Sequence, residues 1–167
     1  RSAYAQPGNF FTTSPGALSQ SHASIDDPNH CTDCHDTGTR DISNKACLGC
    51  HDHKDLAKNI KDGKGYHASP GVIGKNCGTC HKEHKKRTFD IMGWAAVGGE
   101  KNFNHKLTGW PLNGKHATTD CAECHKAKNQ QGLKVYMGTS RTCGSANCHQ
   151  NDQPHKLVRQ DMLECDR

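Results

Sequence analysis

The distribution of apolar positions along the chain predicts few regular elements. Residues 53–60 have a helical composition and run into Asp62-Gly63, a typical helix stop, and a second short helix is expected over residues 157–163. Strands are hard to find. The first 20 residues carry Pro, Gly, Ser and Thr without periodicity, which indicates an extended arm. The longest nearly apolar run, residues 91–99, is far too short to span a membrane.

The composition is too polar for an ordinary side-chain core. Apolar residues make up 32% of the 167 residues, aromatic residues 5%, and the mean hydropathy is −0.92. Such a chain would normally stay disordered, because it cannot bury enough apolar area to offset the loss of chain entropy. The 11 cysteines and 13 histidines are far more than a disordered linker carries. Disulfides, zinc or haem must therefore supply the core.

The charge balance says little about partners. The formal net charge is +5, and the densest basic run is Lys-Glu-His-Lys-Lys-Arg at residues 82–87. A solvated loop explains that run better than a nucleic-acid patch, so no nucleic-acid partner is expected.

Four cysteine pairs have the spacing Cys-x-x-Cys, and a histidine follows each pair at once. The motifs are Cys31/Cys34/His35, Cys47/Cys50/His51, Cys77/Cys80/His81 and Cys121/Cys124/His125. This is the attachment site of c-type haem, because two thiols add to the two vinyl groups of one porphyrin and the histidine becomes the proximal iron ligand. Zinc ribbons and redox dithiols also use paired cysteines, but neither needs that histidine.

The remaining cysteines extend the pattern. Cys143 and Cys148 are separated by four residues and followed by His149, which predicts a fifth attachment site with a longer loop; the alternative is a disulfide or a chance pair. Cys165 is either an unpaired thiol or the start of a sixth motif cut off after Arg167. We therefore expect five c-type haems, with a sixth beyond the chain end as the further alternative.

A second axial ligand for each iron is expected to be histidine. The chain has only three methionines, none in a context that singles it out, whereas eight histidines remain after the five proximal ones. Bis-histidine iron is six-coordinate and closed to substrates, as an electron carrier requires. The expected distal ligands are His22, His67, His84, His105 and His116, with His155 as a further candidate for the fifth or the sixth haem. His30 and His53 lie next to attachment motifs and are interpreted as surface or second-shell groups.

An internal repeat carries a family resemblance. The triplet His-Ala-Ser/Thr begins at His22, His67 and His116, each time shortly before a Cys-x-x-Cys-His motif, and Phe103-Asn104-His105 precedes the last of these. This arrangement resembles the class III cytochromes (cytochrome c3 and c7) over residues 22–167, and longer cysteine spacings are a known variant in them. The resemblance implies that His105 ligates the haem of the following motif and that His116 ligates a different haem.

The expected architecture follows from these motifs. We predict an extended arm over residues 1–21 and a multihaem domain over residues 22–167, with repeat-like modules at about 22–66, 67–100 and 101–167 and an end cut before a sixth haem motif as an alternative. The fold class is mostly irregular with short α-helices, a haem-packed core and little or no β-sheet. Porphyrin rings would replace the missing aliphatic core.

The resulting function is electron transfer through covalently bound, mostly bis-histidine haems, with no catalytic residues. Covalent haem attachment occurs outside the cytoplasm, which predicts a periplasmic, extracellular or outer-surface location in a bacterium or archaeon. Expected partners are redox proteins or a membrane quinol-linked complex. Two alternatives stay open: a subunit that assembles with other cytochrome subunits in a filament or respiratory complex, and a multihaem reductase with one open haem. No Cys-x-x-Cys-Lys motif, common in pentahaem nitrite reductases, supports the reductase.

Overall fold

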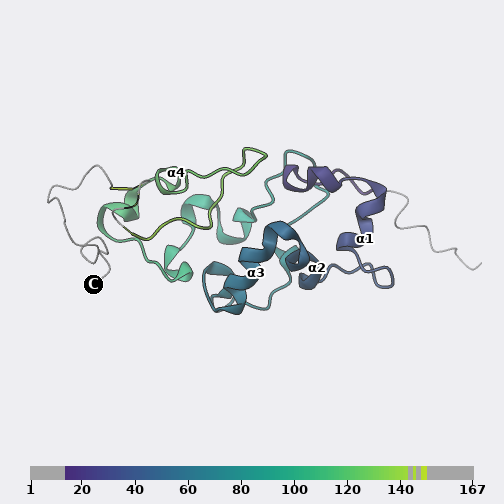
Figure 1. Cartoon of the computed structure of the whole chain (residues 1–167), viewed down its shortest axis with the longest axis horizontal. Coiled ribbons are helices and arrows are strands. Elements are labelled where there is room, and N and C mark those ends of the chain that lie inside the picture. The colour runs from purple at the N-terminus through teal and green to yellow at the C-terminus, as the bar shows by residue number, and fades with distance from the viewer. Residues whose placement is uncertain (1–13, 143–144, 146–147, 150–167) are drawn as a thin grey trace, which may run out of the picture. The chain divides into compact units, whose positions relative to one another are not determined.

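The computed structural model describes residues 14–142, 145, 148 and 149 (Figure 1). The residues up to Asn113 form one compact unit, and those from Gly114 onward form a second. The predicted module boundaries near residues 66 and 100 stay predictions. The expected helix at 157–163 lies outside the described residues.

Helices are short wherever the structure describes the chain. Helix α3 (Lys54–Lys61) confirms the helix expected from composition, and Gly63 ends it in the left-handed region with φ 68°. The other α-helices are α1 (Cys31–Cys34), α2 (Asn44–Gly49) and α4 (Cys121–Cys124). The 3-10 helices are η2 (Gln20–Ile25), η3 (Pro28–His30), η4 (His51–His53), η5 (Tyr66–Ala68), η6 (Cys77–Thr79), η7 (Trp94–Val97), η8 (Glu100–Asn102), η9 (His105–Thr108) and η10 (Gly114–Thr118).

One glycine-rich segment contains a helical turn. The glycine-rich stretch of residues 93–99 holds η7, which lies between Gly93 and Gly98. Both glycines have left-handed φ values, 75° and 77°, which a side chain would disfavour. The two glycines therefore let the chain enter and leave a tight turn that composition alone does not reveal.

β-structure is limited to isolated antiparallel bridges within the described part of the chain. One bridge joins His35 to Ile42, and the other joins Lys128 to Lys134. This agrees with the predicted class of short helices and irregular backbone with little or no sheet. None of the helices in that part is long and apolar enough to cross a membrane.

No apolar side chain is fully buried among the described residues. The buried side chains there are two serines, Ser19 at 2% and Ser69 at 6% exposure. The largest ring cluster is a half-buried aromatic group in which Tyr66 and Trp94 pack edge-on against Phe103, with ring centres 5.0 and 5.7 Å away. The side chains alone thus form no hydrophobic core in this part of the protein, as the composition predicts.

Two asparagines join the loop before α2 to the segment before η6. Asn44 Nδ2 donates to Lys75 O at 2.8 Å, and Asn44 Oδ1 accepts from Cys77 N at 2.8 Å. Asn76 Nδ2 donates in return to Ile42 O at 2.9 Å. These reciprocal bonds hold the second and third cysteine motifs side by side.

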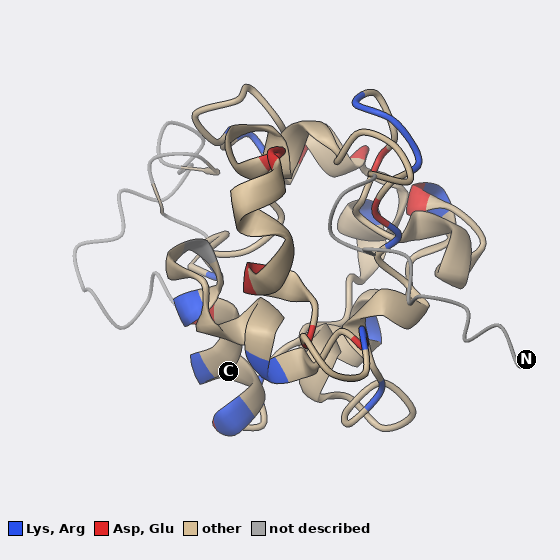
Figure 2. Ribbon diagram, turned by 90° about the vertical axis from the view of Figure 1, so that its right-hand side faces the viewer, with Lys and Arg blue, Asp and Glu red and all other residues tan. Residues whose placement is uncertain are grey.

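The described part of the N-terminal segment is bound to residues 83–87. Leu18 N donates to Asp26 Oδ2 at 3.2 Å, and Arg87 Nη2 donates to the same oxygen at 2.5 Å. Ser19 donates to Glu83 through both its backbone N and its hydroxyl, each at 2.7 Å. Elsewhere, basic and acidic residues are interspersed along the ribbon (Figure 2).

We expect the chain to fold only when its haems are attached. A haem-free chain, made in the cytoplasm where attachment does not occur, should give the circular dichroism of an unfolded protein and no cooperative thermal transition. The haem-loaded protein, measured in the same buffer, should unfold cooperatively. Cooperative unfolding of the haem-free chain would contradict this expectation.

Candidate functional site

The Cys-x-x-Cys-His motifs form single helical turns. In the first, third and fourth motifs, the backbone N of the histidine donates to the carbonyl of the first cysteine. The three bonds, His35 N to Cys31 O, His81 N to Cys77 O and His125 N to Cys121 O, are each 2.9 Å long. The predicted short helices at the motifs are therefore confirmed, and the turn brings two thiols and one imidazole to one place.

The Nδ1 atoms of these three histidines are bonded to the chain. His35 Nδ1 donates to Arg40 O at 2.9 Å, and His81 Nδ1 donates to Ile91 O at 2.6 Å. His125 Nδ1 lies 3.0 Å from the Thr139 hydroxyl. Because a carbonyl can only accept, Nδ1 of His35 and of His81 carries the hydrogen and Nε2 keeps a lone pair for a metal.

Hydrogen bonds within the loop after α1 fix the position of the Arg40 carbonyl, which accepts from His35 Nδ1. Asp36 Oδ1 accepts from the backbone N of Gly38 and of Thr39, each at 2.9 Å. These hydrogen bonds lower the pKa of the Asp36 carboxyl. Arg40 has a left-handed φ of 67°, unusual for a residue with a side chain, which marks a local strain at the residue whose carbonyl holds the imidazole.

Four pairs of histidine rings, which we call the facing pairs, have nearly the same separation. The pairs and their ring-centre distances are His22–His53 at 6.4 Å, His35–His84 at 6.2 Å, His67–His81 at 6.0 Å and His116–His149 at 6.0 Å. Two metal–nitrogen bonds of about 2 Å on opposite sides of one ion place imidazole centres about 6 Å apart. The separation therefore fits two axial ligands of a single iron.

The partners of the proximal histidines come from distant segments. His84 has a left-handed φ of 58°, and its Nδ1 donates to Gly16 O at 2.7 Å. Strained backbone of this kind collects at functional positions. Burial lowers the pKa of His67, which favours the neutral imidazole that binds metal.

A carboxylate holds His22. Its Nδ1 donates to Glu83 Oε1 at 2.5 Å, and the Glu83 side chain is only 18% exposed. Burial raises the pKa of Glu83, but the hydrogen bonds from Ser19 and His22 outweigh that effect and lower it, so the carboxylate stays charged. A charged acceptor on Nδ1 makes an imidazole a stronger electron donor to a metal.

The second motif is arranged differently. The His51 side chain is exposed, whereas His53, interpreted from the sequence as a surface or second-shell group, is half-buried and faces His22. His30 matches its surface interpretation, because Nδ1 lies 2.7 Å from Asp33 and Nε2 lies 3.5 Å from Asp27. The hydrogen bond with Asp33 raises the pKa of His30.

The remaining predicted ligands have separate surroundings. His105 lies 5.5 Å from the Phe103 ring, and burial lowers the pKa of His105. It belongs to the first compact unit, while His125 belongs to the second and lies 5.1 Å from the Tyr136 ring. Cys143, His155 and Cys165 lie outside the described residues.

Thiols of successive motifs are neighbours. Burial, together with the adjacent Cys77 thiol, raises the pKa of Cys47 to about 11. Burial also raises the pKa of Cys34, with the nearby Cys50 thiol as the next cause. The attachment points of the first, second and third motifs thus follow one another in space as they do along the chain.

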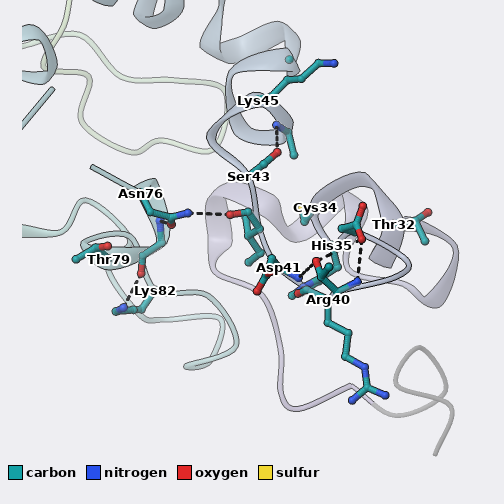
Figure 3. Close-up of a pocket in the computed structure, with 16 residues that line it drawn as sticks. Thr32, Cys34, His35, Arg40, Asp41, Ser43, Lys45, Asn76, Thr79 and Lys82 are labelled. Carbon is teal, nitrogen blue, oxygen red and sulfur yellow. Dashed lines mark hydrogen bonds between the residues drawn. The ribbon is translucent and has the colours of Figure 1, made fainter. Parts of the chain in front are cut away.

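A cavity of about 1170 Å³ adjoins the first motif. Cys34, His35 and Arg40 lie on one side of it, and Asn76 and Lys82 lie on the other (Figure 3). Its volume exceeds the range of about 300–1,000 Å³ that is usual for small-molecule sites. The cavity offers a thiol, an imidazole and basic side chains to one occupant, which fits a large ring that carries carboxylates.

The residues therefore fit covalently bound haem at more than one place. The motifs supply thiols, the facing pairs supply imidazoles at an iron-spanning separation, and the cavity supplies space. Ser69 adds a further sign: its buried hydroxyl, two residues after His67, has no hydrogen-bond partner among the residues that the structure describes. Sequence reasoning missed the roles of Glu83 and His53, because neither stands at a position that a motif defines.

Residues 19–92 match the family model described as cytochrome c3. This segment, somewhat less than half of the chain, contains the first three Cys-x-x-Cys-His motifs. Over these residues the match bears out the predicted resemblance, and it supports a multihaem c-type cytochrome of the c3 type, a family whose members carry electrons on covalently bound haem. No curated protein and no solved structure matches the chain.

Replacement of Glu83 by glutamine should raise the reduction potential of the haem bound by His22 more than that of any other haem. Loss of the negative charge beside His22 makes the ligand less basic and destabilises the ferric state. A shift of about 60 mV, one tenfold change in a one-electron equilibrium, is expected in spectroelectrochemical titration. Asp55→Asn removes an exposed carboxylate from the first turn of α3 and should leave all potentials in place. If the two variants had the same haem reduction potentials, Glu83 would not tune the haem bound by His22.

Proposed function

We propose that this chain attaches five c-type haems, most of them bis-histidine ligated, and passes electrons among them between redox partners outside the cytoplasm. The observation that carries the proposal is the common separation of 6.0–6.4 Å between the rings of the facing pairs. Each haem supplies an iron that alternates between the ferrous and ferric states and so carries one electron.

The residues divide the work in a regular way. The first haem is attached to Cys31 and Cys34 and lies between His35 and His84. The third haem is attached to Cys77 and Cys80 and lies between His81 and His67. The fifth haem is ligated by His149 and His116. Its attachment thiols are Cys148 and the expected partner Cys143. His125 ligates the fourth haem. With imidazole on both faces, an iron has no open position for a substrate, which favours a carrier over a reductase.

The order of the attachment points supports transfer along a row. Cys34 lies near Cys50 and Cys47 lies beside Cys77, so the second motif contacts both the first and the third. Adjacent attachment thiols bring porphyrin edges close together, and electron transfer over short gaps is fast. A redox protein or a membrane quinol-linked complex could deliver electrons to such a row.

Two measurements on the oxidised protein test the proposal. Mass spectrometry should count five haems per chain, and electron paramagnetic resonance should show low-spin iron only. The ring planes of His35–His84 and His67–His81 are nearly parallel, at 24° and 26°, which favours rhombic low-spin signals. The planes of His116–His149 meet at 79°, which favours a strongly anisotropic signal. Fewer than five haems, or stoichiometric high-spin iron, would overturn the proposal.

Substitution of one distal ligand should affect one iron. His84→Ala removes the imidazole opposite His35 and should turn about one iron in five high-spin at an unchanged haem count. His30→Ala is the matched control, because both ring nitrogens of His30 face carboxylates, and its spectrum should equal that of the parent. An unchanged spectrum for the His84 variant would remove His84 from the ligand set.

A further inference from the structure

The chain that follows the fourth motif folds back onto that motif. An antiparallel bridge between Lys128 and Lys134 closes a turn, and Val135 is the first residue beyond it. Inside the turn, Asn129 N donates to Leu133 O at 2.9 Å, and Asn129 Oδ1 accepts from Leu133 N at 2.8 Å. The chain therefore reverses direction within a few residues, and the segment after Val135 returns to the histidine of the motif.

Two side chains of the returning segment contact His125. The hydroxyl oxygen of Thr139 lies 3.0 Å from His125 Nδ1. The Tyr136 ring lies with its centre 5.1 Å from that of the imidazole, and the two planes meet at 48°. Both residues are half-buried. A single segment thus places a hydrogen-bond partner on Nδ1 and an aromatic ring beside the imidazole.

The partner on Nδ1 differs in kind from the partners of two other motif histidines. His35 and His81 donate to backbone carbonyls, at Arg40 O and Ile91 O. When Nε2 of His125 binds iron, Nδ1 carries the hydrogen, so the threonine hydroxyl is the acceptor there. This acceptor belongs to a side chain, and a substitution can therefore remove it or change its charge.

The acceptor on Nδ1 influences the iron that the same imidazole binds. A stronger acceptor makes the imidazole a better electron donor, which stabilises the ferric state and lowers the reduction potential. The carboxylate of Glu83, which accepts from His22, is the strongest acceptor of this set because it is charged. The backbone carbonyls follow, and the neutral hydroxyl of Thr139 is the weakest.

We propose that Thr139 is a positioning residue for the fourth haem, which fixes the orientation of the His125 imidazole and tunes the reduction potential of its iron through Nδ1. The weak acceptor contributes less to the ferric state than a backbone carbonyl does, and so it favours residence of the electron on this haem. This inference rests on the proposed attachment of haem at the fourth motif. It deepens that proposal by naming the side chain that adjusts one centre of the row.

The test is a series of variants at position 139 in the full, haem-loaded chain, with each haem followed separately in a redox titration by NMR. Thr139→Val removes the acceptor and should raise the potential of one haem by about 30 mV, a threefold change in its one-electron equilibrium. Thr139→Asp places a carboxylate beside Nδ1 and should lower the same potential by about 60 mV, a tenfold change. Thr139→Ser keeps the hydroxyl and should keep the parent potential.

Thr142→Val is the matched control in the same compact unit. The Thr142 side chain is exposed, and its hydroxyl lies 2.8 Å from the hydroxyl of Ser140 and not beside an imidazole. This variant should leave all haem potentials at their parent values.

The sign of the shifts separates tuning from a merely structural role. Loss of packing alone would move the potential in the same direction in Thr139→Val and Thr139→Asp, so shifts of equal sign, or no shift, would overturn the inference. If Thr139→Val carries one haem fewer by mass, Thr139→Asp decides: a lowered potential supports the inference, and an unchanged or raised one overturns it. Five haems in the parent protein with equal potentials across the series would refute the role of Thr139 and leave the proposed function intact.

Discussion

The common separation of 6.0–6.4 Å between the imidazole rings of the facing pairs is the geometric constraint around which the described segments are arranged. No apolar side chain is fully buried in the described part of the chain, so packing of side chains cannot by itself hold the segments together. The facing pairs join segments that side-chain packing does not hold together. The ring of His84 lies opposite that of His35, and the ring of His67 lies opposite that of His81. The irregular backbone between these histidines has only to place each ring opposite its partner, and short helical turns are sufficient for that.

The stretch from His81 to His84 contacts histidines of three facing pairs. His81 faces His67, Glu83 holds His22, and His84 faces His35. Three of the facing pairs thus involve four consecutive residues, and within this stretch His84 has a left-handed φ of 58°. Such a junction couples the facing pairs mechanically, since a displacement of this turn moves rings of more than one pair. It also couples them electrostatically, because the Glu83 carboxylate lies one residue from His84.

The second motif is the place where the three N-terminal motifs meet. Its thiols lie beside those of the first and third motifs, and Asn44 and Asn76 bind its flanking loop to the segment before η6. The second motif is followed at once by η4 and then by α3, the longest helix among the described residues, so its C-terminal side continues into regular structure.

The sequence by itself determined the chemistry: paired thiols followed by histidine define haem attachment at any position in a fold, because the thiols and the imidazole act within one helical turn. It also determined α3, which local composition and Asp62-Gly63 specify, and the lack of a side-chain core, which follows from polarity alone. Only the tertiary structure decided which histidines face each other, because His22 and His53 or His35 and His84 are brought together by long-range contacts. The selection of Glu83 as the partner of His22, and the pairing of the His22 ring with that of His53, likewise depend on contacts between segments far apart in the chain, which no local pattern encodes.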